Sequence, residues 1–175
     1  MSTTTRTMVS ALFKDRASAD RAYQSVLDRG YRHDQITTVM TDEARQRHYP
    51  EGRVGADEGN KALEGSGVGG AIGTITGGLI GAIAAIGTNL ILPGLGLVVA
   101  GPLAAGLAGA GAGGLTGGLV GALVGWGIPE EHAKDYETGL TEGGIVLGVE
   151  CASEADARAI ESDWRSAGAA RIDRY

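Results

Sequence analysis

The sequence predicts an α+β fold, a single domain split by a long, glycine-rich insertion. Residues 65–129 contain no Asp, Glu, Lys or Arg, whereas the blocks on either side of them are rich in charge. Each flanking block holds an apolar run, a helix-period segment that ends at a glycine, and a second apolar run. Because neither half buries enough apolar surface alone, residues 1–41 and 144–175 are expected to fold together.

The first half begins with the strand-like run TMVSALF, residues 7–13. A helix should follow, with Ser18 as its N-cap and Gly30 at the place of its C-cap. The run QITTVMT, residues 35–41, is rich in β-branched side chains and predicts a second strand. The first half therefore has the order β-α-β.

The second half repeats this order. The run GIVLGVE, residues 144–150, is strand-like, Ser153 should cap a helix that ends at Gly168, and residues 170–175 should form a terminal strand. Two β-α-β halves that share one antiparallel sheet, with both helices on one face, make the ferredoxin-like plan.

Two polar segments border the insertion. Residues 42–64 are charged and interrupted by Pro50 and several glycines, which predicts a linker with a short helix at each end. Residues 128–143 predict a short connecting helix, in which Pro129 suits the first turn and acidic residues follow it.

The insertion contains glycines at a spacing of four residues, which places them along one face of a helix. Such stripes let two helices approach backbone to backbone, as in glycine zippers. Pro and Gly residues in the stretch 88–102 break helix, so residues 65–127 predict a helical hairpin with arms at 65–87 and 102–127. The residues expected to carry helix packing and self-assembly are Gly69, Gly73, Gly77, Gly81, Gly109, Gly113, Gly117, Gly121 and Gly125.

Glycine costs about 1 kcal/mol per helical position relative to Ala, so this hairpin needs an environment that compensates. A bilayer is one such environment, because each arm at 1.5 Å per residue would exceed a hydrocarbon core of about 30 Å. Close packing among copies in a soluble oligomer is the other. The acidic flanks Glu64, Glu130 and Glu131 lack the basic residues typical of membrane spans, so both environments stay open.

Several function classes are disfavoured. The net charge is -6, with no basic stripe for nucleic acid. The glycine pattern in GSGVGG, residues 65–70, follows polar residues instead of a strand, so a nucleotide site is not expected. His33, His48 and His132 lack metal-ligand spacing. We expect no catalytic residues, no metal and no cofactor.

Two stretches of the sequence resemble those of a known protein family. The exit GWGIPEEHAKDYETGLTEGGIVLGV and the segment LPGLGLVVAGPLAAGLAG resemble the bacterial general stress (heat-induced stress) protein family, and the similarity covers nearly the whole chain. The resemblance implies ferredoxin-like ends around a glycine-rich middle. It also implies a bacterial, stress-associated protein that is not an enzyme.

We therefore expect a structural protein that self-assembles through the glycine-zipper hairpin, in or on the inner membrane, with its α+β head on the cytoplasmic side. Its expected partners are further copies of itself and membrane lipid, and not nucleic acid. The alternative is a soluble homo-oligomer that buries the hairpins in a helical core, with heads that sense a ligand.

Overall fold

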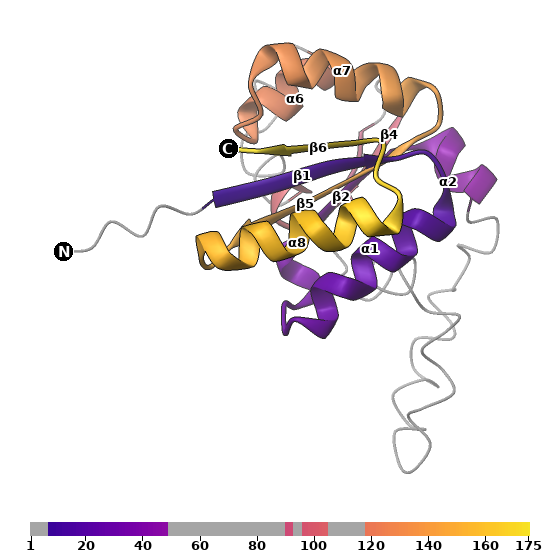
Figure 1. Ribbon diagram of the computed structural model, residues 1–175. Coiled ribbons are helices and arrows are strands. Elements are labelled where there is room, and N and C mark those ends of the chain that lie inside the picture. Colours follow the sequence, from indigo (N-terminus) through magenta and orange to yellow (C-terminus); the bar gives the residue numbers. More distant parts are fainter. Residues whose placement is uncertain (1–6, 49–89, 93–95, 105–117) are drawn as a thin grey trace, which may run out of the picture.

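The computed structural model describes residues 7–48, 90–92, 96–104 and 118–175 and confirms the α+β class. Helices cover both faces of one antiparallel sheet (Figure 1). The elements in chain order are β1 (Thr7–Phe13), α1 (Arg16–Asp28), the 3-10 turn η1 (His33–Gln35), β2 (Ile36–Thr41), α2 (Asp42–His48), β3 (Leu90–Leu92), β4 (Leu97–Ala100), α6 (Gly118–Gly125), α7 (Glu130–Thr141), β5 (Ile145–Cys151), α8 (Glu154–Ala167) and β6 (Arg171–Arg174).

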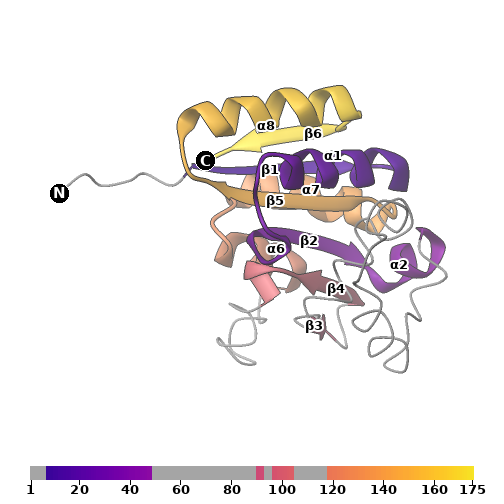
Figure 2. The same ribbon diagram turned by 90° about the horizontal axis from the view of Figure 1, so that it is seen from below.

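The six strands lie in the order β3-β4-β2-β5-β1-β6, which Figure 2 shows from below. Every neighbouring pair is antiparallel. Strand β1 pairs with β5 from Thr7 opposite Cys151 to Phe13 opposite Ile145, and its other edge pairs with β6. The beginning and the end of the chain therefore share one sheet.

Both faces of the sheet are buried, by α1 and α8 on one side and by α6 and α7 on the other (Figure 1). In β1, Val9 and Phe13 belong to the α1–α8 layer, whereas Met8 and Leu12 belong to the α6–α7 layer. Successive residues of a strand point to opposite faces, so a strand that is covered on both sides reads as an unbroken apolar run. This explains the composition of residues 7–13.

Trp164 of α8 anchors the layer below the sheet. It is fully buried, its indole Nε1–H donates to the carbonyl of Ala22 in α1 at 3.0 Å, and its ring meets Phe13 edge-on with centroids 6.0 Å apart. One side chain thus contacts both the neighbouring helix and strand β1. Full burial of a side chain of this size contributes on the order of 2–3 kcal/mol to folding.

The helix caps agree with the sequence at α8 and differ at α1. Ser153 accepts a hydrogen bond from the amide of Asp156, and Gly168 follows α8 with a left-handed φ of 98° that suits glycine, as predicted. In α1 the N-cap is Asp15, so the prediction of Ser18 is wrong. Ser18 lies three residues inside the helix and gives both its amide and its hydroxyl hydrogen to the Asp15 carboxylate.

Within the segment 88–102, expected to be a helix-breaking reversal, the described residues contribute the two strands β3 and β4 to the sheet. β3 pairs with β4, and β4 pairs with the edge of β2 from Thr38 opposite Ala100 to Thr41 opposite Leu97. Of the second predicted arm, residues 118–125 form helix α6, which begins at Gly118 with a φ of 65°. Residues 65–87, the first arm, lie outside the described residues. The expected short helix at the start of the linker is α2.

Trp126, directly after α6, lies against the sheet at a position without a side chain. A Cβ atom built on Gly148 of β5 would overlap the six-membered ring of Trp126. Glycine inside a strand often marks such a close approach. The contact packs the connection between α6 and α7 onto the sheet.

We expect Gly148→Ala to destabilise the protein by about 1–3 kcal/mol, because the new methyl group forces the Trp126 ring off the sheet. Urea unfolding of this variant, of Trp126→Leu and of the double variant would show whether the Gly148→Ala change still lowers the stability once the Trp126 ring is absent. Gly121→Ala is the matched control, since a Cβ at Gly121 meets no atom within 4 Å. A Gly148→Ala variant as stable as that control would contradict the close contact.

Loss of the α1 cap should depend on pH. The hydrogen bonds from Ser18 hold the pKa of Asp15 below its ordinary value of 3.8, so its carboxylate stabilises the fold above that pH and loses this effect as the pH falls through the lowered pKa. Asp15→Ala should cost about 1 kcal/mol at pH 7 and less at pH 2.5, measured by urea unfolding. Ser153→Ala, which removes an uncharged cap, is the control. An equal cost of Asp15→Ala at both pH values would refute this account.

Candidate functional site

Two of the predicted glycine-zipper residues, Gly121 and Gly125, lie in the described part of the chain, both in α6. They are one helical turn apart and therefore share a face. The other seven predicted positions lie outside the described residues, and these are Gly69, Gly73, Gly77, Gly81, Gly109, Gly113 and Gly117.

Helix α6 has one side on the sheet and one side turned outward. Leu119, Ala122 and Leu123 are buried in the α6–α7 layer. Gly121 and Gly125 face away from that layer, and a Cβ atom at either position meets no atom within 4 Å in the part of the chain that the structure describes. Val124, between them, is 42% exposed. We call Gly121, Val124 and Gly125 the outward face of α6, whereas Val120 packs against the α6–α7 layer.

A second group of side chains, which the sequence did not predict, joins α7 to β1 and β6. Tyr136 of α7 is fully buried, and its hydroxyl donates to Asp173 of β6 at 2.9 Å. The hydroxyl oxygens of Ser10 in β1 and Tyr136 lie 2.9 Å apart. Because Tyr136 gives its own hydrogen to Asp173, Ser10 is the donor in this second bond. Burial raises the pKa of Tyr136 well above its ordinary value, so the phenol keeps its proton. We call Ser10, His132, Tyr136, Asp173 and Tyr175 the α7–β6 cluster.

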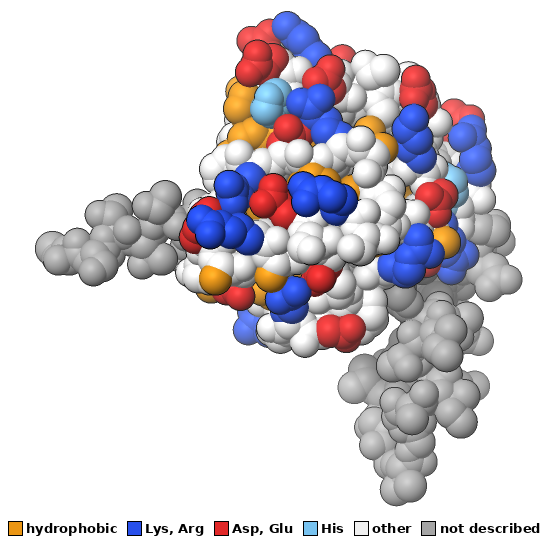
Figure 3. Space-filling view, viewed as in Figure 1, with side chains coloured by type: hydrophobic (Ala, Val, Ile, Leu, Met, Phe, Trp, Pro, Cys, Tyr) orange, Lys and Arg blue, Asp and Glu red, His pale blue; other side chains and the backbone are white. Residues whose placement is uncertain are grey.

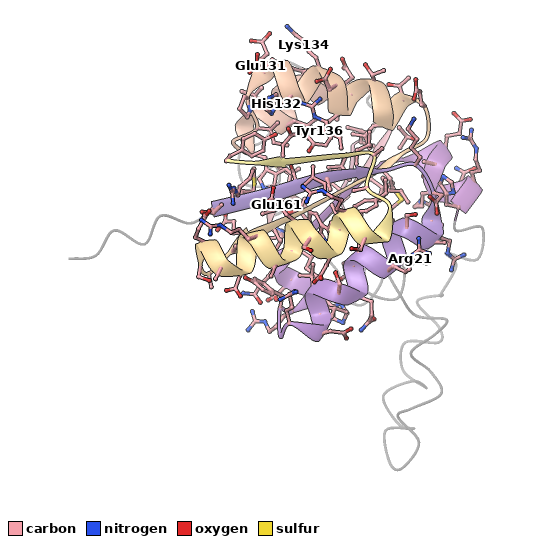
Figure 4. All side chains as sticks on the ribbon, viewed as in Figure 1. Arg21, Glu131, His132, Lys134, Tyr136 and Glu161 are labelled. Atoms are coloured by element: carbon pink, nitrogen blue, oxygen red, sulfur yellow. The ribbon has the colours of Figure 1, made fainter. Side chains whose placement is uncertain are left out.

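His132 and Arg171 complete the contacts of this cluster. Nδ1 of His132 lies 3.0 Å from the Tyr175 hydroxyl and 3.4 Å from an oxygen of Asp173. Arg171 bonds the Asp173 carboxylate through Nε and the Asp135 carboxylate at 2.6 Å. In Figure 4, Tyr136 lies between α7 and β6, whereas Lys134 lies on the far side of α7.

His132 and Asp135 of α7 both contact residues of β6, although the Asp135 side chain is 56% exposed and remains a surface charge. Asp173 is 13% exposed and is engaged by Tyr136, Arg171 and His132, so the cluster fastens α7 to the last strand. A carboxylate with three such partners is held in one orientation. The signal in the sequence was the spacing of His132 and Tyr136, four residues apart on one helix face.

Charges of both signs are mixed over the face shown in Figure 3. Several of the ion pairs cross between elements, for example Arg29 with Asp163 at 2.7 Å and Arg174 with Glu154 at 2.9 Å. Ion pairs at this degree of exposure contribute about 0–1 kcal/mol each to folding stability. Their main effect is that the opposite charges on the surface cancel.

The described residues contain no group of three or more His, Cys, Asp or Glu side chains that could hold a metal ion. None of the helices that the structure describes combines the length and the hydropathy needed to cross a bilayer. Comparison with protein-family models, with curated proteins and with solved structures finds no match for this chain.

Tyr136→Phe should destabilise the protein by about 1–3 kcal/mol, because it leaves the buried Ser10 hydroxyl without its acceptor and removes a donor from Asp173. Ser10→Ala should cost less, since Tyr136 keeps its bond to Asp173. Urea unfolding of the two single variants and the double variant gives the coupling between them. Additive effects of the two changes would contradict a shared network.

Proposed function

We propose that the chain is a non-enzymatic structural protein whose copies associate with one another through the glycine-rich segment. In this proposal, β1-α1-β2 and β5-α8-β6 form a ferredoxin-like domain that the segment splits. The strand order β2-β5-β1-β6 and the packing of α1 and α8 on one face of the sheet support this assignment.

The observation that carries the proposal is the outward face of α6. It is uncharged, it carries two glycines one turn apart, and no atom of the described residues lies within 4 Å of where their Cβ atoms would be. Each glycine costs such a helix about 1 kcal/mol relative to Ala. Close packing of a second helix along Gly121 and Gly125 would offset that cost through contacts that a larger side chain prevents.

The buried side of α6 supports the same proposal. Leu123 and Ile128 are fully buried beneath the helix and its exit, so the outward face is presented by a fixed element. A fixed surface loses less conformational entropy when it associates than a mobile one does. The partner in this proposal is the same face of a second copy, together with the zipper positions outside the described residues.

The setting of this assembly follows from the sequence. The resemblance to bacterial general stress proteins favours a role in the stress response, with the uncharged segment in or on the inner membrane. A soluble homo-oligomer is the second candidate. Cell fractionation without detergent separates the two, because a defined particle in the clear supernatant supports the soluble assembly and recovery with the membrane supports the first.

The double variant Gly121→Leu/Gly125→Leu should reduce self-association while the fold is kept. Leu is favoured over Gly in helices by about 0.8 kcal/mol, and both positions have free space, so thermal stability should be unchanged or raised. Light scattering after gel filtration, with and without detergent, should show a smaller particle than the wild type. Ser162→Leu, an exposed change in α8, controls for added apolar surface. A particle of wild-type mass in the double variant would overturn the proposal.

A further inference from the structure

A cavity of about 590 Å³ opens where β2 begins and β5 ends. Thr37 and Gly148, which face each other across the two strands, line it from the sheet. Trp126 lines it from the exit of α6, and Pro102 from the residues after β4. A cavity of this size lies within the range of small-molecule sites, about 300–1,000 Å³.

The cavity owes its shape to the contact between Trp126 and Gly148. Because Gly148 has no side chain, the ring of Trp126 lies on the strand and one side of the indole forms a wall. The amide of Trp126 bonds the carbonyls of Ala122 and Leu123, and Ile128 two residues later is fully buried. These contacts hold the wall in place.

The chemistry of the lining has two parts. Trp126 and Tyr31 supply aromatic rings, and Asp34 and Glu150 supply carboxylates. Hydrogen bonds from Arg32 hold the pKa of Asp34 below its ordinary value, so that carboxylate is ionised near neutral pH. Among the described residues that line the cavity there is no Lys, Arg or His.

Such a lining favours a cationic ligand. Aromatic faces attract cations through their quadrupole, and carboxylates add to that attraction. Arg32 offsets part of the charge of Asp34, but its side chain is 74% exposed and it is not among the lining residues. Cys151 adds no charge, because burial raises the pKa of its thiol to about 11.

We propose that this cavity binds a small organic cation, an amine or quaternary ammonium compound, with its charged group against Trp126 and Tyr31 and near Glu150. The function of self-association does not require this site, so the two proposals stand or fall separately.

The test uses choline and its neutral counterpart 3,3-dimethyl-1-butanol, which differ in the replacement of the charged nitrogen by carbon. The full chain, labelled with ¹⁵N, is titrated with each while the indole N–H signals are followed by NMR. The chain has two tryptophans, and Trp164 in the opposite layer is the internal control. Trp126→Phe assigns the two signals.

Choline should shift the Trp126 signal in a saturable way, and the neutral alcohol should bind at least tenfold more weakly. Glu150→Gln should weaken choline binding about fivefold or more. Glu142→Gln removes an exposed carboxylate at the end of α7 and changes the net charge by the same amount as Glu150→Gln. This control variant should bind choline as the wild type does.

Three results would overturn the proposal. The first is equal binding of choline and the alcohol, which would make the cavity a site for neutral ligands. The second is tighter binding of butyrate than of choline. The third is a Trp126 signal that does not move with choline, or with putrescine as a second cation.

Discussion

The antiparallel pairing of β1 with β5 is the interaction on which the rest of the structure depends. It joins segments from opposite ends of the chain, from Thr7 opposite Cys151 to Phe13 opposite Ile145. Closing so long a loop costs entropy, although that cost grows only slowly with loop length. Burial of both faces of these strands offsets it, because the helix layers on the two sides of the sheet both pack on β1 and β5. Because β1 precedes the glycine-rich insertion and β5 follows it, their pairing anchors the chain on both sides of the insertion.

The two faces of this sheet differ in chemistry. The α1–α8 face is apolar around Trp164, whereas a row of small or polar residues crosses the α6–α7 face, Asp173, Ser10, Gly148 and Thr37, each opposite the next. Each residue of this row contacts a residue of the layer that covers it. Tyr136 bonds Asp173 and Ser10, Trp126 lies on Gly148, and the amide of Leu103 donates to Thr37. Burial of polar groups requires such partners.

Both proposed surfaces meet at α6. The outward face ends at Gly125, and the next residue, Trp126, forms a wall of the cavity. The helix is short and its inner side is buried, so the domain fixes the position of both surfaces. The α7–β6 cluster holds the next helix, α7, against the sheet through its bonds to Asp173 and Tyr175. The α6–α7 layer therefore contributes to both of the proposed sites.

The sequence by itself determined the strands β1, β2, β5 and β6, of which β5 is predicted at 144–150 and lies at Ile145–Cys151, and the helices α1, α7 and α8. Apolar runs and capping residues such as Ser153 act on their immediate neighbours, so these elements follow from local sequence. Tertiary structure decided how they pair and which surfaces they present. Strands β3 and β4 form in a stretch broken by Pro and Gly because the edge of β2 offers unpaired backbone groups. The cavity, the α7–β6 cluster and the register of the sheet join residues far apart in the chain, and such contacts are set by packing that no local pattern encodes.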